Sequence, residues 1–265
     1  MYETTYHRPS SVDEAARLLS ANPEAKLLAG GMTLLPTMKL RLAAPSDIVD
    51  IGRIAELKQI REEGGAVVIG AGATHYAVAN DATVKSRIPT LASLAESIGD
   101  PHVRYMGTIG GSVANNDPAA DYPSALVALG ATVVTNRRKV EAEAFFTGMF
   151  ETALDEGEIV TAVSFPVPRR AGYAKLRNPA SHYPMAGVFV AERSDGGVRV
   201  AVIGAGPCVF RVEAMERALA SDFSEAAIAG ISVPADGLNS DIHGAADYRA
   251  HLVTVMARRA VASAR

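Results

Sequence analysis

The chain has 265 residues, a mass of 27.7 kDa and a formal net charge of −3 at neutral pH, so it can bury a substantial core in one to three domains. Its Lys and Arg residues are dispersed and the pI is near 6.1, which argues against a nucleic-acid partner. No apolar run approaches the ~18 residues of a membrane span, and the N-terminal residues lack the pattern of a secretory signal. We therefore expect a globular protein of the cytoplasm without a membrane span.

The chain has a single cysteine, Cys208, and six histidines. One cysteine can neither form an internal disulfide nor supply the ligands of an iron–sulfur cluster. We interpret Cys208 as a packed small residue rather than a nucleophile. The histidines have no metal-ligand spacing with one another or with carboxylates, so we expect no metal site and assign them solvated or hydrogen-bonded structural roles.

The first 55 residues predict strands and helices around one glycine turn. Ser11 and Glu14 have the spacing of a capping box, which predicts a helix start. In chain order the expected elements are an early strand, a helix at 11–21, a buried strand at 26–30 that runs into the glycines, a short helix at 33–43 and a strand at 47–51.

The next segment combines a hairpin with helices. Glu63-Gly64-Gly65 separates two runs of strand character, which is typical of a β-hairpin. The last helix of this segment has Asp121 at its N-cap, Pro123 in its first turn and Gly130 at its end. The expected elements are the hairpin at 60–72, helices at 76–88, 90–99 and 121–130, and strands at 131–135 and 159–165.

Residues 166–170, Pro-Val-Pro-Arg-Arg, mark a boundary. Beyond it a hairpin turns at Asp195-Gly196-Gly197, and residues 211–220 and 247–264 have helical periodicity. Strands and helices are segregated rather than alternating, which favours an α+β fold over a doubly wound sheet. We expect three regions, at 1–55, 56–168 and 169–265.

Two glycine pairs, Gly30-Gly31 and Gly110-Gly111, are candidates for an anion site. Glycine permits positive φ and lets backbone N–H groups approach a ligand closely, so two such turns suit a pyrophosphate. Each pair is interpreted as following a buried strand, and each has a threonine at its edge, Thr33 or Thr108. The alternative is that both pairs form tight turns without a ligand, as expected for the glycines of the two hairpins.

Two other segments, 69–75 and 202–209, begin like the dinucleotide fingerprint, with a strand followed by Gly-x-Gly. The third glycine is missing, because His75 and Val209 stand in its place, and both segments follow hairpins. We therefore do not expect a Rossmann nucleotide site.

The glycine pairs lie within longer motifs. LLAGGMTLLPTMK at 27–39 and GTIGGSVANNDPAADYPSALVALGA at 107–131 resemble the two flavin-binding segments of the FAD-binding medium subunit of molybdenum hydroxylases, the group that includes carbon monoxide dehydrogenase and xanthine dehydrogenase. The resemblance continues through EGEIVTAVSFPVP and YAKLRNPASHYPMAGVFVA and covers essentially the whole chain. It implies a two-part FAD-binding domain of the vanillyl-alcohol oxidase type, followed by a C-terminal α+β subdomain with a small antiparallel sheet.

The resemblance also implies FAD contacts for individual residues. Met32-Thr33 departs from the commoner pair at its position in the family, Thr-Asp or His-Ser. No residue is assigned as a catalytic acid or base. The residues expected to bind the cofactor are Ala29, Gly30, Gly31, Met32 and Thr33 in the first loop, Thr108, Ile109, Gly110 and Gly111 in the second, and Asn115, Asp121 and Tyr183.

Several of these roles have alternatives. Asp121 matches an acidic residue near the flavin ribityl or ribose hydroxyls, or it acts only as a helix N-cap. Tyr183 matches an aromatic residue that covers the isoalloxazine ring, or it is an exposed or core tyrosine. Lys175 and Arg177 could place positive charge near a reduced flavin, although we favour a solvated surface face for both. Asn116 is expected to line the turn beside Asn115.

The resemblance implies an electron-transfer subunit of a heteromeric enzyme. Molybdopterin and two [2Fe–2S] clusters are expected on partner chains, a large molybdenum subunit and a small iron–sulfur subunit, arranged as a dimer of heterotrimers. Electrons would pass through FAD to NAD⁺, dioxygen or a quinone. Two alternatives stay open: a self-contained flavin oxidase of the vanillyl-alcohol oxidase type, and a non-catalytic scaffold.

Overall fold

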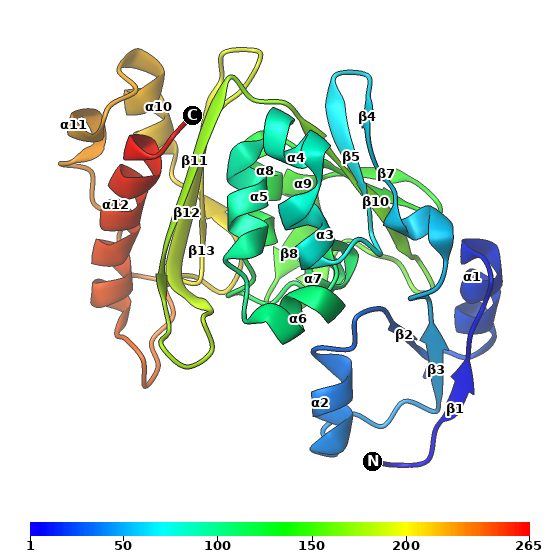
Figure 1. The fold of residues 1–265 in the computed structure, drawn as a ribbon. Coiled ribbons are helices and arrows are strands. Elements are labelled where there is room, and N and C mark those ends of the chain that lie inside the picture. Colours follow the sequence, from blue (N-terminus) through cyan, green and yellow to red (C-terminus); the bar gives the residue numbers. More distant parts are fainter.

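In the computed structural model, which describes residues 1–265, the N-terminal part is a small parallel sheet with two helices (Figure 1). Strands and helices alternate here, so the prediction that they are segregated is wrong for this part. Strand β2 lies at the edge of the sheet and is only half-buried or exposed, so the prediction of a buried strand is also wrong. The elements are β1 (Thr5–His7), α1 (Val12–Ala21), β2 (Lys26–Leu28), α2 (Leu34–Lys39) and β3 (Asp47–Asp50), with strand order β1-β3-β2.

The capping box at the start of α1 is present, with one change of partner. The Ser11 hydroxyl accepts the N–H of Glu14, as the spacing predicts. The Glu14 carboxylate reaches back to the N–H of Ser10 instead of Ser11. The helix therefore begins where the sequence predicts it.

The middle of the chain forms a five-stranded antiparallel sheet whose central strand comes last in sequence. The predicted hairpin pairs β4 with β5, and Gly64 and Gly65 turn it with positive φ. The sheet order is β4 (Ile60–Glu63), β5 (Ala66–Gly70), β10 (Val160–Pro166), β6 (Thr132–Thr135) and β7 (Lys139–Glu141). A short helix η1 (Ala55–Lys58) precedes it, and α9 (Ala142–Phe145), β8 (Phe146–Gly148) and β9 (Glu151–Thr152) connect β7 to β10.

Helices occupy the chain between β5 and β6. The predicted helix at 76–88 is divided in two, because Asp81 leaves the helical conformation and its carboxylate caps the second half. Helix α6 stands where the sequence predicted a buried strand, and α7 stands where it predicted a glycine turn. The helices are α3 (His75–Asn80), α4 (Ala82–Arg87), α5 (Pro89–Glu96), α6 (Pro101–Met106), α7 (Ile109–Asn115) and α8 (Tyr122–Leu129).

Helix α8 is the centre of the molecule. All of its residues are buried, and it ends at Gly130 in the left-handed conformation, as predicted. Figure 1 shows α8 and α5 between the five-stranded sheet and the sheet that follows in the chain. The helix thereby joins both sheets in one core.

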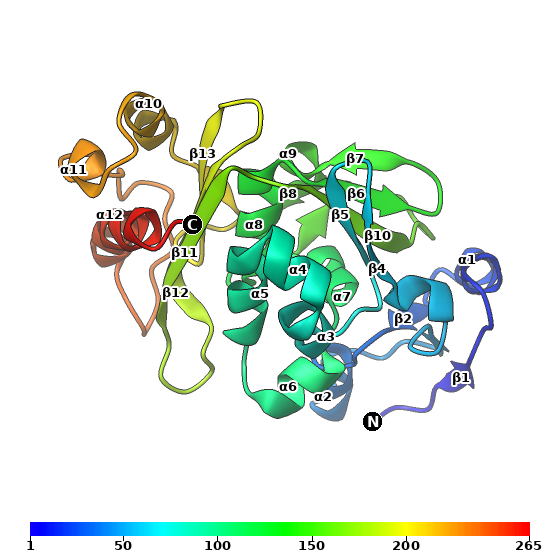
Figure 2. The same cartoon turned by 45° about the horizontal axis from the view of Figure 1, so that its top comes forward.

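The C-terminal sheet separates two hydrophobic cores, one packed against each of its faces. On β12, Phe189 and Ala191 face the central core, whereas Val188 and Val190 belong to a separate core under the last helices. Figure 2 shows α10, α11 and α12 on one side of this sheet and α5 and α8 on the other. The elements are β11 (Arg170–Arg177), β12 (Pro184–Glu192), β13 (Val198–Ile203), β14 (Phe210–Arg211), α10 (Glu213–Ser221), α11 (Glu225–Ile228) and α12 (Ala246–Ala262).

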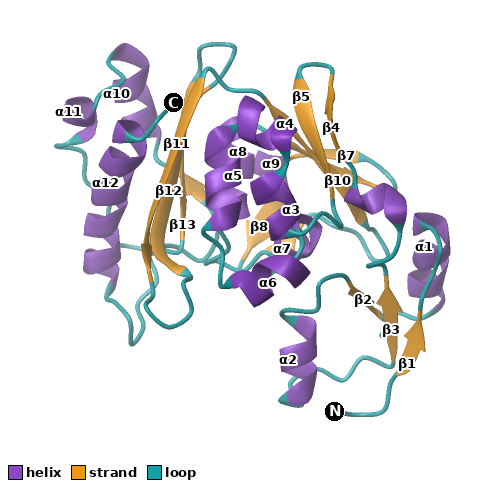
Figure 3. Cartoon of the chain, in the orientation of Figure 1, coloured by secondary structure: helices purple, strands orange, loops and turns teal.

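The whole is a mixed helix and sheet protein with small sheets, of which those after residue 59 are antiparallel (Figure 3). This agrees with the expected α+β class in its main features. None of the helices combines the length and the apolar character that crossing a membrane requires.

Candidate cofactor-binding site

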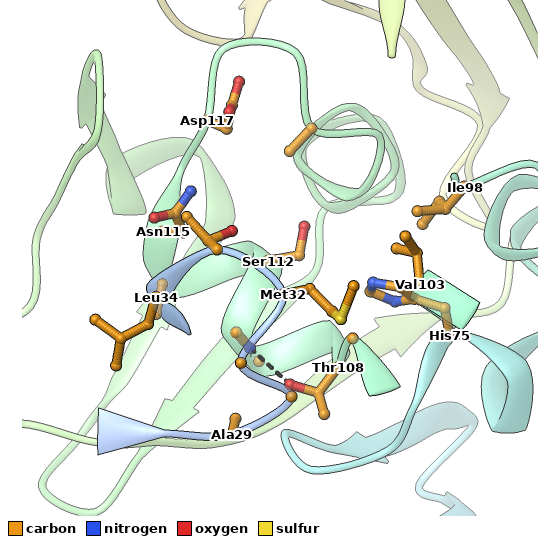
Figure 4. A pocket seen from close by; sticks show the side chains of 18 of the residues that line it. Ala29, Met32, Leu34, His75, Ile98, Val103, Thr108, Ser112, Asn115 and Asp117 are labelled. Atoms are coloured by element: carbon orange, nitrogen blue, oxygen red, sulfur yellow. Dashed lines mark hydrogen bonds between the residues drawn. The ribbon is translucent and has the colours of Figure 1, made fainter. Parts of the chain in front are cut away.

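A cavity of about 630 Å³ lies where the N-terminal sheet, the helices of the middle segment and the β11–β12 hairpin meet (Figure 4). Its size is typical of a site for a cofactor or another small molecule. The residues predicted to bind FAD gather here, with one exception, Ile109. Those that line the cavity are Ala29, Gly30, Gly31, Met32, Thr33, Thr108, Gly110, Gly111, Asn115, Asp121 and Tyr183.

The first glycine loop, residues 29–33, has the geometry predicted for it. The N–H groups of residues 30–33 donate to no other group of the chain. Gly31 has a φ of 72°, and a Cβ on Gly30 would lie 2.1 Å from the carbonyl oxygen of Met106. Glycine is therefore required at both positions, and the loop offers a run of free donors to an anion.

The second glycine pair is the start of a helix and not a turn. Thr108 caps α7 by accepting the Gly111 N–H at 3.1 Å, the bond that Figure 4 draws as a dashed line. The N–H groups of Ile109 and Gly110 donate to the carbonyl oxygens of Ala73 and Ala71. Neither glycine has positive φ, and α6 precedes the pair instead of a strand. The prediction of free N–H donors and of a preceding buried strand is wrong here.

What α7 presents to the cavity is hydroxyl and bare backbone. Ser112 follows Thr108 by four residues, so both side chains lie on the same face of the helix and line the cavity. The glycines have different functions: a Cβ on Gly110 would lie 2.4 Å from Cβ of Ala71, whereas one on Gly111 would meet only Oγ1 of Thr108 at 3.0 Å and Cβ of Ala29 at 3.9 Å. Gly110 allows close packing, and Gly111 keeps the space between the two loops open.

Ile109, predicted to bind the cofactor, and Asn116, predicted to line the turn beside Asn115, both lie outside the cavity. Ile109 is fully buried in the central core, because it points to the opposite side of α7. Asn116 is 1% exposed, adopts a left-handed conformation and donates to the carbonyl oxygens of Gly148 and Glu151. Asn116 therefore ties the end of α7 to the β8–β9 connection, while Asn115 alone lines the cavity.

Asp121 is part of a buried ion pair. Its Oδ1 accepts from Lys175 Nζ at 2.6 Å and from the Tyr173 hydroxyl at 2.5 Å, and it makes no side-chain bond to the N-terminus of α8. Asp121 stands at the N-cap position, as predicted, but its side chain does not cap the helix. The solvated position favoured for Lys175 is wrong, because its side chain is 3% exposed. No buried side-chain oxygen or nitrogen lacks a partner, so Oδ2, which accepts no bond, keeps contact with the cavity that Asp121 lines.

Another lining residue of the cavity, His75, carries a neutral imidazole. His75 is 5% exposed, and its Nδ1 lies 3.3 Å from the Tyr122 hydroxyl, which agrees with the structural role assigned to the histidines. Burial, with a smaller effect of Arg104, lowers the pKa of His75 to about 4. The imidazole therefore carries no charge at neutral pH.

The β11–β12 hairpin reaches over one end of the cavity. His182, with a φ of 60°, lies with Nδ1 3.1 Å from the carbonyl oxygen of Gly99 in the α5–α6 connection. Tyr183 follows it, lines the cavity and is 47% exposed. The tyrosine is thus at the opening, next to both the cavity and solvent.

Comparison with known proteins decides the family. Residues 2–168 match the model of the FAD binding domain in molybdopterin dehydrogenase. The chain belongs to this family. It is therefore a medium, FAD-binding subunit of the molybdenum hydroxylases, and so a component of an oxidoreductase.

Relatives of this FAD-binding subunit match it over nearly their whole length. The carbon monoxide dehydrogenase medium chain of Hydrogenophaga pseudoflava is 38% identical over 98% of this chain and 96% of the relative. The nicotine 6-hydroxylase medium subunit of Paenarthrobacter nicotinovorans is 37% identical with the same coverage. A chain of the reconstituted CO dehydrogenase from Oligotropha carboxidovorans matches with a TM-score of 0.88 at 35% identity, over 98% of this chain and 97% of that one.

The residues of the cavity fit FAD. The free N–H groups of the first loop suit a diphosphate. Lys26, on the strand β2 that leads into this loop, also lines the cavity and provides a positive charge. Thr33, Thr108 and Ser112 line the same cavity and carry hydroxyl groups. Sequence reasoning missed Lys26 and Ser112; the available signals were a cation three residues before the loop and a serine one helical turn after Thr108.

Proposed function

We propose that this chain transfers electrons from iron–sulfur clusters on a partner chain, through its FAD, to NAD⁺, dioxygen or a quinone. The observation that carries the proposal is an FAD site in a chain with one cysteine, half-buried Cys208. Because one thiolate cannot ligate a cluster, the electrons that reach the flavin come from another chain. Bound FAD supplies the exchange between one-electron and two-electron transfer.

The protein's own contribution is to bind and orient the cofactor. The N–H groups of residues 30–33 would hold the diphosphate, and Gly111 would leave room for it between the loops. Oδ2 of Asp121 would accept from a ribityl or ribose hydroxyl, since Lys175 and Tyr173 already fix Oδ1. Tyr183 would cover the ring system at the opening of the cavity.

We further propose the assembly expected from the sequence: a small [2Fe–2S] subunit and a large molybdopterin subunit in a dimer of heterotrimers, located in the cytoplasm. Similarity to medium chains named for carbon monoxide and for nicotine supports a chain that leaves substrate choice to a partner. The same proposal divides the chain at 1–55, 56–168 and 169–265. The first two regions would form the two-part FAD domain of the vanillyl-alcohol oxidase type.

The test is a complex assembled with a flavin-free form of this chain. If the proposal is right, substrate still reduces the clusters, but transfer to the acceptor stops and returns when FAD is added. Reduction of the acceptor at the full rate without flavin would contradict it. Oxidation of small alcohols by the isolated FAD-loaded chain would instead support the self-contained oxidase.

A further inference from the structure

A second cavity lies on the far side of the Asp121–Lys175 pair from the FAD site. It has a volume of about 390 Å³ and lies between α5, strand β11 and the last residues of the chain. Tyr173, Lys175 and Arg177 alternate along β11, so their side chains share the face of the strand that lines this cavity. The cavity is separate from the FAD site, because Lys175 lines only the second cavity and Asp121 only the first.

The second cavity is basic although the protein as a whole is acidic. Three residues with cationic side chains line it, Lys175, Arg177 and Arg265, and no Asp or Glu does. The side chain of Arg177 makes no hydrogen bond or ion pair in the chain. Burial is the main cause that lowers the pKa of Lys175, Asp121 opposes this effect, and the nearby charge of Arg177 adds to the lowering.

The cationic groups of these residues have few partners in the chain. Lys175 Nζ has three N–H bonds and donates one of them to Asp121, and the five N–H bonds of the Arg177 guanidinium have no protein partner. Arg265 is held at the cavity because its backbone pairs with Ala171 in both directions, and its guanidinium has one long contact, 3.5 Å from Ser93 Oγ. The side chain of Lys175 is 3% exposed, so its charge sits in a medium where an anion interacts strongly with it.

We propose that this cavity binds a phosphate anion, free or as the phosphate of a small organic molecule. A phosphate between Lys175 and Arg177 would receive charge-assisted hydrogen bonds from both and remove their repulsion. The volume exceeds the need of one phosphate, which leaves room for an attached organic group. The inference stands independently of the electron-transfer function proposed above.

The experiment is a calorimetric titration of the full FAD-loaded chain with inorganic phosphate and, separately, with AMP, in a phosphate-free buffer of constant ionic strength. We expect saturable binding of one equivalent, at least tenfold weaker in Arg177→Gln. Arg217→Gln removes an exposed guanidinium of α10 that pairs with Glu213, and it should bind like the unmodified chain. Phosphate alone saturating the site indicates free phosphate, and tighter binding of AMP indicates an organic phosphate.

Failure of either ligand to saturate, or equal binding by Arg177→Gln, would overturn the proposal. Flavin content, read from the visible spectrum, is measured in every variant. Because Arg177 does not line the FAD cavity, flavin content should be the same in Arg177→Gln as in the unmodified chain. A loss of flavin in Arg217→Gln would report a damaged fold, in which case Arg169→Gln, at another exposed ion pair, replaces it as the control.

Discussion

Lys175 Nζ lies 2.6 Å from Oδ1 of Asp121, and each of the two side chains is only 3% exposed. Burial lowers the pKa of Lys175, and the neighbouring carboxylate partly opposes this effect. Lys175 therefore has Asp121 as its only ion-pair partner in the chain, and the Asp121 carboxylate also accepts the Tyr173 hydroxyl. Removing one partner leaves the other charged in the interior, which is costly.

The first prediction is that Lys175→Met lowers the free energy of unfolding by roughly 3–5 kcal/mol, the usual cost of breaking a buried pair. Chemical denaturation of the apo chain measures it. As a control, Arg217→Met breaks an exposed ion pair with Glu213, one helical turn away, and should lower the free energy of unfolding by no more than about 0.5 kcal/mol. The double variant Lys175→Met/Asp121→Asn should recover part of the loss; strictly additive effects would show that the two charges are not coupled.

Asp121→Asn gives the second prediction, because it keeps the size of the side chain but removes its charge. Lys175 then lacks its counter-charge and Oδ2 no longer offers a carboxylate to the cavity. Both the stability of the apo chain and its affinity for FAD should fall, which denaturation and flavin titration measure separately. Unchanged FAD affinity would remove Asp121 from the cofactor contacts and leave only its structural role.

The third prediction uses the different surroundings of the α7 glycines. Gly111→Val should yield a folded chain with little FAD, because the new side chain fills the space between Thr108 and Ala29. Circular dichroism and the flavin spectrum test the two halves of this expectation. Gly230→Val, in open space on the surface, should retain FAD; Gly110→Val should lower stability itself, because a Cβ there collides with Ala71. A folded Gly111→Val chain with full flavin content would contradict the prediction that a side chain at this position excludes FAD.

His75 predicts a pH dependence of stability. Its pKa in the folded protein, about 4, is below the ordinary value of 6.5, so the unfolded chain binds more protons between these values. The stability contributed by the neutral imidazole is complete above pH 6.5 and is lost as the pH falls towards 4, by roughly 3 kcal/mol at most. Unfolding at pH 6.5 and pH 5 should differ less in His75→Gln than in the unmodified chain. His102→Gln, at a side chain that is 95% exposed, should keep the full difference.

Tyr183→Ala should separate cofactor binding from electron transfer. On the proposed function the first loop and α7 would still hold FAD, so flavin content should stay normal. The rate of transfer to the acceptor should change, because the ring would lose its proposed cover. Tyr248→Ala removes a tyrosine of similar exposure on α12, away from the cavity, and serves as the control. Identical acceptor kinetics in all three chains would make Tyr183 an ordinary surface residue.

The sequence predicted the cavity better than it predicted the backbone of its two loops. Gly31 was identifiable because only glycine accepts its positive φ readily, and this requirement is local. Gly110 was taken for a turn residue, but glycine is needed there because a Cβ would lie within 3 Å of Ala71. The fold brings Ala71 close, and no local pattern reveals this. The two glycine pairs correctly predicted the location of the cavity, but the second pair forms the start of a helix and not the predicted turn.

Lys175 shows the same limit for side chains. Alternation along β11 places it on the face of Tyr173 and Arg177, yet whether that face meets water depends on α8 and Asp121, 54 residues earlier in the chain. A lysine in a strand is ordinarily solvated, so local reasoning favoured the surface. Burial of charge is a tertiary property, and the partner that permits it has to be known first.

The sheet that separates the two larger cores has a consequence for how the protein melts. Because successive residues of β12 pack into opposite cores, neither core can come apart without exposing one face of the same strand. The smaller N-terminal core is joined as well, since Ile159, the residue before β10, completes it. Heating should therefore give one calorimetric transition with matching van't Hoff and calorimetric enthalpies, and excision of residues 169–265 should leave an insoluble remainder rather than a working flavin module.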